Sequence, residues 1–345
     1  MSAQGAMLRI GVIGLGYWGP LVARNVSASS GAELSLLCDT DPGRLEAQRA
    51  LYPDARLVGS AADVFGDPTV EAVVIATPVR THHSLARDAL LSGKHVLVEK
   101  PLAASVSQAE DLVRIADHAH LVLMVDHVFL YSPAVRAVAG FLRRGELGEI
   151  SFIDSVRINL GLVQHDVSVI WDLAPHDLSI INYLVDRPPK GLVAVASSSG
   201  ALGMPSVAHL HVDYGGGLLA SVHVNWLSPV KIRHFLVGGT RRSVLYNDLD
   251  RSEPVKIYDR GVDVTVSPER RREVLVSYRT GDVLSPNVDK TEPLRNVIQH
   301  FCECVSNGLR PLTDGAHGLR VVRLLEAADS SLAEGGKYVD IPEGP

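Results

Sequence analysis

Cysteine is scarce in this chain of 345 residues, which contains only Cys38, Cys302 and Cys304. Cys38 lies in an apolar run, which is typical of a small buried side chain. Cys302 and Cys304 are two residues apart with no neighbouring cysteine pair, so their spacing suits neither a zinc site nor a disulfide framework. We therefore interpret Cys302 and Cys304 as positions in a helix.

An excess of positive charge is lacking as well. The chain has 33 Lys and Arg residues against 39 Asp and Glu residues, which gives a net charge of −6. A general nucleic-acid binder needs a basic face that displaces the counterions of the phosphates, so this balance argues against that class of protein. An anionic small-molecule substrate is not excluded, because a few local cations suffice to bind it.

Long apolar runs are also missing. No stretch approaches the roughly 18 apolar residues of a membrane helix, and residues 1–7 lack the basic start and apolar core of a signal peptide. The sequence therefore predicts a cytoplasmic protein without a membrane partner. At roughly 100–200 residues per domain, its length suggests two domains.

The first third of the chain alternates apolar runs with helical stretches. The apolar runs, which we interpret as strands, are Leu8–Ile13, Leu34–Cys38, Val70–Ala76, His95–Val98 and Leu121–Val125. Ser105 and Gln108 have capping-box spacing and predict a helix start. Near-continuous apolar strands separated by helices predict a doubly wound parallel sheet, a Rossmann-type α/β fold, over residues 1–126.

Beyond residue 126 the apolar pattern changes to a period of two. In Val207–Tyr214 and again in Leu218–Trp226 every second residue is apolar, and three glycines separate the two runs. This pattern predicts an antiparallel hairpin. Further short strands and two C-terminal helices, over Glu292–Ser306 and Ala316–Ala333, complete an α+β substrate-binding and oligomerisation domain over residues 127–345.

A glycine-rich turn follows the first strand. Gly14, Gly16 and Gly19, with Tyr17 and Trp18 between them, match the pattern G-x-G-x-x-G. The first glycine allows the tight turn, the second lets the backbone approach a pyrophosphate, and the third lets the helix pack on the strand. Because this turn joins a strand to a helix, it predicts a dinucleotide site with the phosphates at the helix N-terminus.

Asp39 ends the second strand, 20 residues after Gly19. A carboxylate at this position accepts hydrogen bonds from the adenosine ribose and repels a 2′-phosphate. The sequence therefore predicts NAD as the cofactor, with NADP less favoured. Arg44 is close enough in the sequence to weaken the exclusion of NADP.

Two polar segments follow strand ends in the first domain, where ligands of doubly wound sheets bind. They are Thr77-Pro78 and Glu99-Lys100-Pro101. A lysine ammonium beside a substrate hydroxyl would stabilise alkoxide character during hydride transfer. From position alone, the alternative is that Lys100 is a solvated lysine at a strand end.

The segment Trp171–Asp177 contains a second candidate group. Because proline is tolerated in the first turn of a helix, Pro175 predicts that the helix begins near Asp172. Asp172 and His176 are four residues apart and can share one helix face. His176 suits a general base, and Asp172 could orient a substrate hydroxyl or the imidazole. The alternative is that Asp172 caps the helix and His176 is an ordinary buried histidine.

The glycine turn, Thr77-Pro78 and Gly-Lys-His-Val-Leu-Val-Glu-Lys-Pro at residues 93–101 together resemble the Gfo/Idh/MocA family, named for glucose–fructose oxidoreductase and inositol dehydrogenase. The resemblance covers nearly the whole chain. It implies a Rossmann domain followed by an α+β domain with an open-faced, mostly antiparallel sheet. It also implies that Glu99 and Lys100 lie against the nicotinamide ribose, and that His82 lies near the cofactor.

The resemblance further implies that Lys100, Asp172 and His176 act as a triad. The predicted activity is NAD(H)-dependent hydride transfer to or from a secondary alcohol or ketone of a sugar, nucleotide sugar or cyclitol. Alternatives are a keto-sugar reductase, which uses the same triad in reverse, and an NAD-retaining, redox-assisted glycoside hydrolase. A non-catalytic dinucleotide sensor should lack the lysine and the histidine, both of which are present here.

Several polar residues are candidates for substrate contact. They are His127 and Tyr131 at the domain junction, and Arg157, Asn159, Gln164, His165 and Asp166 before the second-domain helix. His165 and Asp166 have no further ligands at metal-like spacing, so we predict no metal site. Many relatives have Arg in place of Leu130, which leaves the substrate open. An open apolar sheet face predicts a homodimer or homotetramer formed through the second domain.

Overall fold

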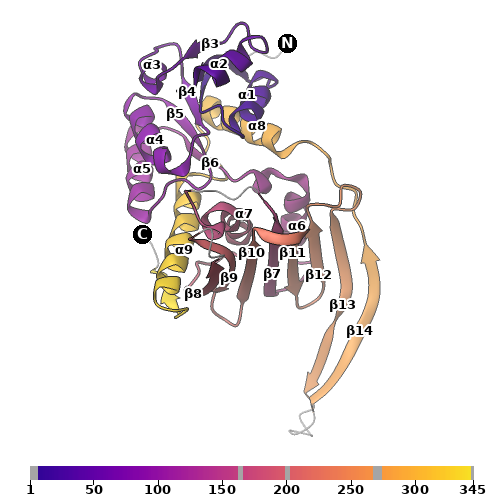
Figure 1. Ribbon diagram of the computed structural model, residues 1–345. Helices are drawn as coiled ribbons and strands as arrows, with labels where there is room; N and C mark the ends of the chain where they lie inside the picture. Colours follow the sequence, from indigo (N-terminus) through magenta and orange to yellow (C-terminus); the bar gives the residue numbers. More distant parts are fainter. Residues whose placement is uncertain (1–6, 162–165, 199–202, 267–273, 343–345) are drawn as a thin grey trace. The chain divides into compact units, whose positions relative to one another are not determined.

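The computed structural model describes residues 7–161, 166–198, 203–266 and 274–342 (Figure 1). The described residues form two compact units, unit 1 up to Ser132 together with residues 291–326, and unit 2 with residues 133–290 and from 327 onward. The sequence predicts a single domain boundary after residue 126. The structure instead returns residues 291–326 to unit 1, because helix α8 (Pro293–Asn307) packs against helix α1 (Gly19–Ser27).

Unit 1 is an alternation of strands and helices. Its remaining elements are β1 (Leu8–Ile13), β2 (Ala32–Cys38), α2 (Pro42–Arg49), β3 (Arg56–Val58), α3 (Ala61–Phe65), β4 (Ala72–Ile75), η1 (Val79–Thr81), α4 (His82–Leu91), β5 (His95–Glu99), α5 (Val106–Ala119), β6 (Leu123–Asp126), η2 (Val128–Tyr131) and the first part of α9 (Gly315–Ala333). Ser105 caps α5 by accepting a hydrogen bond from the N–H of Gln108 at 3.3 Å, as its spacing predicted.

The strands of unit 1 form a six-stranded parallel sheet in the order β3-β2-β1-β4-β5-β6 within the described residues. Figure 1 shows α1 on one face of this sheet and α4 and α5 on the other. All four residues of β4 are buried, as expected for a strand covered on both faces. This is the doubly wound order, whose ligands bind beyond the carboxyl ends of the strands near the switch point between β1 and β4. The predicted Rossmann fold is confirmed.

Unit 2 is built around one large sheet. Its elements are α6 (Pro133–Arg143), β7 (Ile150–Leu160), α7 (Val169–Leu184), β8 (Gly191–Ser198), β9 (Pro205–Asp213), β10 (Leu219–Asn225), β11 (Leu227–Gly239), β12 (Ser243–Asn247), β13 (Val255–Val266), β14 (Val274–Leu284), the end of α9 and β15 (Val339–Asp340). The sheet order is β14-β13-β12-β11-β7-β10-β9-β8-β15, and the described neighbours are antiparallel except for the parallel pair β7 and β10. This confirms the predicted α+β domain.

One face of the unit 2 sheet is covered and the other is open. Helices α6 and α7 pack on the covered face, where Ala208, Leu210 and Val212 of β9 are buried. On the open face, Phe152, Val195 and Leu219 are 39–48% exposed. β9 and β10 form the predicted antiparallel hairpin. The sheet therefore presents exposed apolar side chains.

Helix α7 begins earlier than the sequence predicted. Pro175 was expected in the first turn, with a helix start near Asp172, but α7 starts at Val169 and Pro175 lies in its interior. Proline has no N–H, so the carbonyl four residues before it lacks its usual helical partner. Val169 and Ile170 are fully buried, and their packing explains the additional turn. Among the described residues, no helix is long and apolar enough to cross a membrane.

Candidate functional site

The glycine turn has the tight geometry that its sequence predicted. A side chain at Gly14 would lie 2.6 Å from the carbonyl oxygen of Ala76, and one at Gly19 would lie 2.0 Å from the carbonyl oxygen of Gly14. Gly14 also has a φ of +94°, which favours glycine. Tyr17, at the tip of the turn, is 80% exposed. The turn is therefore packed at both ends and exposed in its middle.

Asp39 lies at the end of β2 and is in contact with this turn. Its Oδ2 accepts a hydrogen bond from the N–H of Leu15 at 2.7 Å, and its Oδ1 accepts one from the N–H of Asp41 at 2.9 Å. The Arg44 guanidinium lies 3.5 Å from Asp39 Oδ2. Asp39 thus stabilises the glycine turn through a hydrogen bond. It also places a carboxylate where the adenosine ribose is expected to bind.

The residues of unit 1 fit a dinucleotide. A methyl group added at Gly16 would find Arg44 Nη1 as its nearest atom, at 3.9 Å, so space is left for a ligand to approach the backbone. Helix α1 has no acidic residue in its first turn, which leaves its positive end to a phosphate. The two observations agree with the carboxylate of Asp39 in predicting NAD.

Thr77 and Pro78 follow β4, and His82 lies behind them. The ring of His82 bridges two backbone carbonyls, that of Thr77 through Nε2 at 2.8 Å and that of Pro101 through Nδ1 at 2.8 Å. Burial lowers the pKa of His82, and the two carbonyl contacts oppose this shift. His82 therefore ties together the two strand-end turns that carry Thr77 and Lys100. The Lys100–Pro101 peptide bond is cis.

Glu99 and Asp126 end the adjacent strands β5 and β6, and the strand register pairs them directly. Trp18, from the glycine turn, donates its indole N–H to Asp126 Oδ2 at 3.2 Å. Glu99 Oε2 accepts a hydrogen bond from the backbone N–H of Lys100 at 3.0 Å. These contacts connect the glycine turn to the strand end that carries Lys100.

His127 and Tyr131 are buried inside unit 1. His127 is 1% exposed and its ring packs edge-on against His317, with 5.3 Å between ring centroids. Burial lowers the pKa of His127 well below its usual value, and His317 and Lys100 lower it further. The hydroxyl of Tyr131 lies 3.1 Å from Thr313 Oγ1. The structure thus places both residues in the core of unit 1.

Unit 2 contributes Asp172 and His176, one helical turn apart on α7. Asp172 Oδ2 accepts a hydrogen bond from Trp226 Nε1 at 3.0 Å. Trp226 lies between β10 and β11 and is 1% exposed. Both Asp172 and His176 are partly exposed. The carboxylate of Asp172 is therefore fixed by a buried tryptophan, while the helix face that it shares with His176 is accessible.

Arg157 and Asn159 lie on β7, on the face that carries α7. Arg157 forms a buried ion pair with Asp177, in which Nε donates to Oδ2 at 2.7 Å and Nη2 donates to Oδ1 at 3.0 Å. The two side chains are 4% and 3% exposed. The pair joins β7 to α7 and fixes the helix immediately after His176. Gln164 and His165 lie outside the described residues, and Asp166 is exposed.

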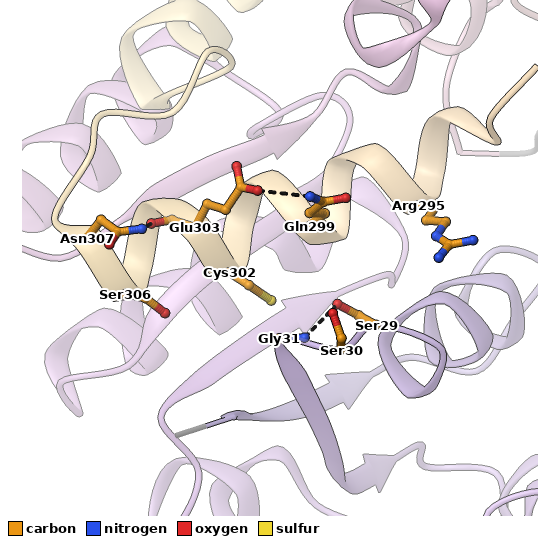
Figure 2. Close-up of a pocket in the computed structure, with 9 residues that line it drawn as sticks. All are labelled: Ser29, Ser30, Gly31, Arg295, Gln299, Cys302, Glu303, Ser306 and Asn307. Atoms are coloured by element: carbon orange, nitrogen blue, oxygen red, sulfur yellow. Dashed lines mark hydrogen bonds between the residues drawn. The ribbon is translucent and has the colours of Figure 1, made fainter. Parts of the chain in front are cut away.

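Two hollows of unit 1 lie at the amino ends of the strands. They therefore do not coincide with the candidate site residues of unit 1, which lie at the carboxyl ends. Figure 2 shows the first, of about 280 Å³, where Cys302 of α8 points toward the turn before β2; it is lined by Ser29, Ser30, Gly31, Arg295, Gln299, Cys302, Glu303, Ser306 and Asn307. Burial raises the pKa of Cys302 to about 11, so the thiol stays protonated. The second hollow, of about 580 Å³, adjoins the starts of β5 and β6.

Cys302 and Cys304 lie on α8 as predicted, and all three cysteines are free and buried. In the described part of the chain, no group of three or more His, Cys, Asp or Glu side chains is arranged to hold a metal ion. The prediction of no metal site remains a prediction.

Sequence reasoning missed Trp226 and Asp126 as parts of the site. Asp126 could have been found, because it ends a strand next to Glu99, at the edge where the other candidates lie. Trp226 offered a weaker signal, because a buried indole N–H requires a partner but the sequence does not say which.

The sequence matches two family descriptions. Residues 8–127 match "Oxidoreductase family, NAD-binding Rossmann fold", and residues 135–245 match "GFO/IDH/MocA C-terminal domain". The chain is 30% identical to the uncharacterized oxidoreductase YdgJ of Escherichia coli over 260 residues, which cover 71% of this chain and 73% of that protein. It is 26% identical to a D-apiose dehydrogenase of Rhizobium rhizogenes over 348 residues, which cover 97% of each chain.

A solved structure is similar over the whole fold. An oxidoreductase from Agrobacterium radiobacter, in complex with NAD+, L-tartaric acid and magnesium, matches with a TM-score of 0.80 at 24% identity. The match covers 97% of this chain and 99% of that chain. At this level of identity the likeness supports the fold.

Proposed function

Because the chain belongs to the Gfo/Idh/MocA family of NAD-binding oxidoreductases, we propose that Lys100, Asp172 and His176 carry out hydride transfer on a secondary alcohol of a sugar, nucleotide sugar or cyclitol. The observation that carries the proposal is the placement, in unit 2, of His176 one helical turn after Asp172, whose carboxylate is held by Trp226. The nearly full-length similarity to a D-apiose dehydrogenase favours a polyhydroxylated substrate.

Oxidation of the alcohol removes a hydride from carbon and a proton from oxygen. NAD, when bound, accepts the hydride. His176 takes the hydroxyl proton, because the usual pKa of histidine lies near neutral pH. The ammonium group of Lys100 stabilises the charge that develops on the oxygen. Asp172 orients the hydroxyl group or the imidazole, and the reverse reaction uses the same three residues.

Asp39 selects NAD in this proposal. Its carboxylate binds the adenosine ribose and repels a 2′-phosphate. Arg44, 3.5 Å from Asp39, neutralises part of that charge, so we expect NADP to bind more weakly than NAD without being excluded. Gly14, Gly16 and Gly19 form the phosphate turn.

The other residues predicted to contact the substrate fall into two groups, one partly or fully exposed and one buried. Asn159 and Asp166 have exposed surface and are proposed to contact the substrate together with Asp172 and His176. His127, Tyr131 and Arg157 are at most 4% exposed. We assign these three a supporting role, in which they fix neighbouring elements from the interior.

A second copy of the chain is the proposed cover of the open sheet face. Phe152, Val195 and Leu219 lie exposed on that face, and the register places Phe152 directly beside Leu219. Exposed apolar side chains gathered on one sheet face mark interfaces. Light scattering at micromolar concentration should give a dimer or tetramer, which Leu219→Asp weakens. A monomeric wild-type protein would contradict the assignment.

The test of activity follows the absorbance of reduced nicotinamide. Purified protein is given NAD or NADP with a panel of free sugars, inositols and nucleotide sugars, and NADH with keto-sugars. We expect turnover with NAD and one substrate class, lost in Lys100→Ala and His176→Ala but retained in the exposed controls Lys337→Ala and His118→Ala. Wild-type rates in either site variant would remove that residue from the mechanism.

A further inference from the structure

Two acidic side chains meet at the carboxyl edge of the unit 1 sheet. Glu99 ends β5 and Asp126 ends β6, and they are direct partners in the parallel register. Their carboxyl groups are close enough to form a side-chain hydrogen bond. Asp126 is 2% exposed, and among the described residues no donor is assigned to its Oδ1. The register therefore brings two carboxyl groups together, that of Asp126 buried and that of Glu99 partly buried.

Two ionised carboxylates cannot share a hydrogen bond, because neither carries a donor and their charges repel. Burial raises the pKa of Glu99 well above its usual range, the charge of Asp126 raises it further, and Lys100 opposes the shift. Burial also raises the pKa of Asp126, but hydrogen bonds from Glu99 and Trp18 oppose that rise. A hydrogen bond between the two groups therefore needs one shared proton, and the larger upward shift of the Glu99 pKa places it on Glu99, with Asp126 as the charged acceptor.

We propose that Glu99 and Asp126 share a single proton and that Asp126 is thereby a positioning residue, which holds the glycine turn through Trp18 and limits the charge beside Lys100 to one. As a carboxylate, Asp126 accepts from both the indole N–H of Trp18 and the carboxyl group of Glu99, and hydrogen bonds to a charged acceptor are the stronger kind.

The cation that faces this pair is Lys100, which acts on the charge of both carboxyl groups. Burial lowers the pKa of the neighbouring His82 and His127, which disfavours a further positive charge on either ring. One shared proton leaves one negative charge opposite the Lys100 ammonium. Loss of that proton would add a second negative charge and weaken the ability of Lys100 to stabilise a developing alkoxide. Only this last step depends on the proposed function.

The direct test is infrared difference spectroscopy of the whole protein between neutral and alkaline pH. The wild type should show the carbonyl stretch of a protonated carboxyl group at neutral pH. Both Glu99→Gln and Asp126→Asn should abolish that band, the first by removing the acid and the second by allowing Glu99 to ionise. Asp117→Asn, a matched change at an exposed position on α5, should retain it. No band in the wild type, or a band that survives in Asp126→Asn, would overturn the shared proton.

Function gives a second, separate measurement. Asp126→Asn should lower kcat/KM by about tenfold, because the indole of Trp18 loses its charged acceptor. It should also remove the alkaline inflection from the pH profile, because Glu99 is then already ionised. A residue that was merely structural would lower the rate and leave the profile unchanged, which would refute the role assigned to Asp126. If the infrared band behaves as expected but no substrate turns over, the shared proton stands and the proposed function fails.

Discussion

Asp177→Asn should destabilise unit 2, because it removes the carboxylate that is paired with a buried guanidinium. The guanidinium of Arg157 makes two hydrogen bonds to the Asp177 carboxylate, at 2.7 and 3.0 Å. Both side chains are almost fully buried, so water cannot replace the lost carboxylate. The neutral amide of Asp177→Asn keeps the shape of the side chain, removes its charge and replaces one acceptor oxygen by an NH2 donor.

The size of the effect follows from this burial. Removing one partner of a buried ion pair costs about 3–5 kcal/mol. Two hydrogen bonds to charged groups, at about 1.5–3 kcal/mol each, give a similar total. Against a typical domain stability of roughly 5–15 kcal/mol, this is a large fraction. Because the pair fixes α7 next to His176, turnover should fall as well.

Urea unfolding followed by tryptophan fluorescence measures the loss, since Trp171 and Trp226 both report on unit 2. Glu46→Gln is the matched control, because it breaks the exposed pair with Arg49, whose side chains are 67% and 64% exposed, and should cost at most about 1 kcal/mol. Replacement of both buried partners by apolar residues, Arg157→Met with Asp177→Leu, should recover much of the stability. A cost below about 1 kcal/mol for Asp177→Asn would refute the reasoning.

Two more predictions concern unit 1. Gly19→Ala should weaken NAD binding by at least about tenfold, or about 1.4 kcal/mol, because the added methyl group would lie 2.0 Å from the Gly14 carbonyl oxygen. Gly59→Ala, whose methyl group would meet nothing within 4 Å, should leave NAD binding unchanged. Fluorescence titration measures both affinities, and equal values would contradict the turn geometry. Burial lowers the pKa of His317 to about 4, so the imidazole binds a proton less readily in the folded state than in the unfolded chain. The stability that the neutral ring contributes is therefore lost as pH falls below about 6.5, and the loss is on the order of 2 kcal/mol at pH 5. Calorimetry at several pH values should show a smaller acid loss in His317→Gln than in the wild type, and equal losses would count against it.

The sequence predicted those features that depend on neighbouring residues. The glycine turn, the cap at Ser105 and the hairpin of β9 and β10 each follow from a local pattern, and each is present. The position of Asp39 at the end of β2 could be predicted equally well from the sequence, because strand, turn and helix lie within one βαβ unit.

The features that the sequence did not predict depend on distant partners. Asp172 and Trp226 are 54 residues apart, and Glu99 and Asp126 meet through the register of two strands. The start of α7 was misplaced because burial of Val169 and Ile170 outweighed the local preference of Pro175. No pattern within a short window contains such information, since tertiary packing overrides local propensity.

The return of residues 291–326 to unit 1 affects how the protein is made on the ribosome. β6 is the last strand of its sheet, and its outer edge is covered where Val125 donates its N–H to the carbonyl oxygen of Thr313 at 2.8 Å and Met124 bridges to Asp314. Translation of residues 133–312 takes roughly 10–40 s at about 5–20 residues per second. During that interval the nascent chain carries an uncovered strand edge, a template for wrong pairing. Chaperone capture of ribosome-bound chains should therefore persist until Thr313 and Asp314 have left the ribosome.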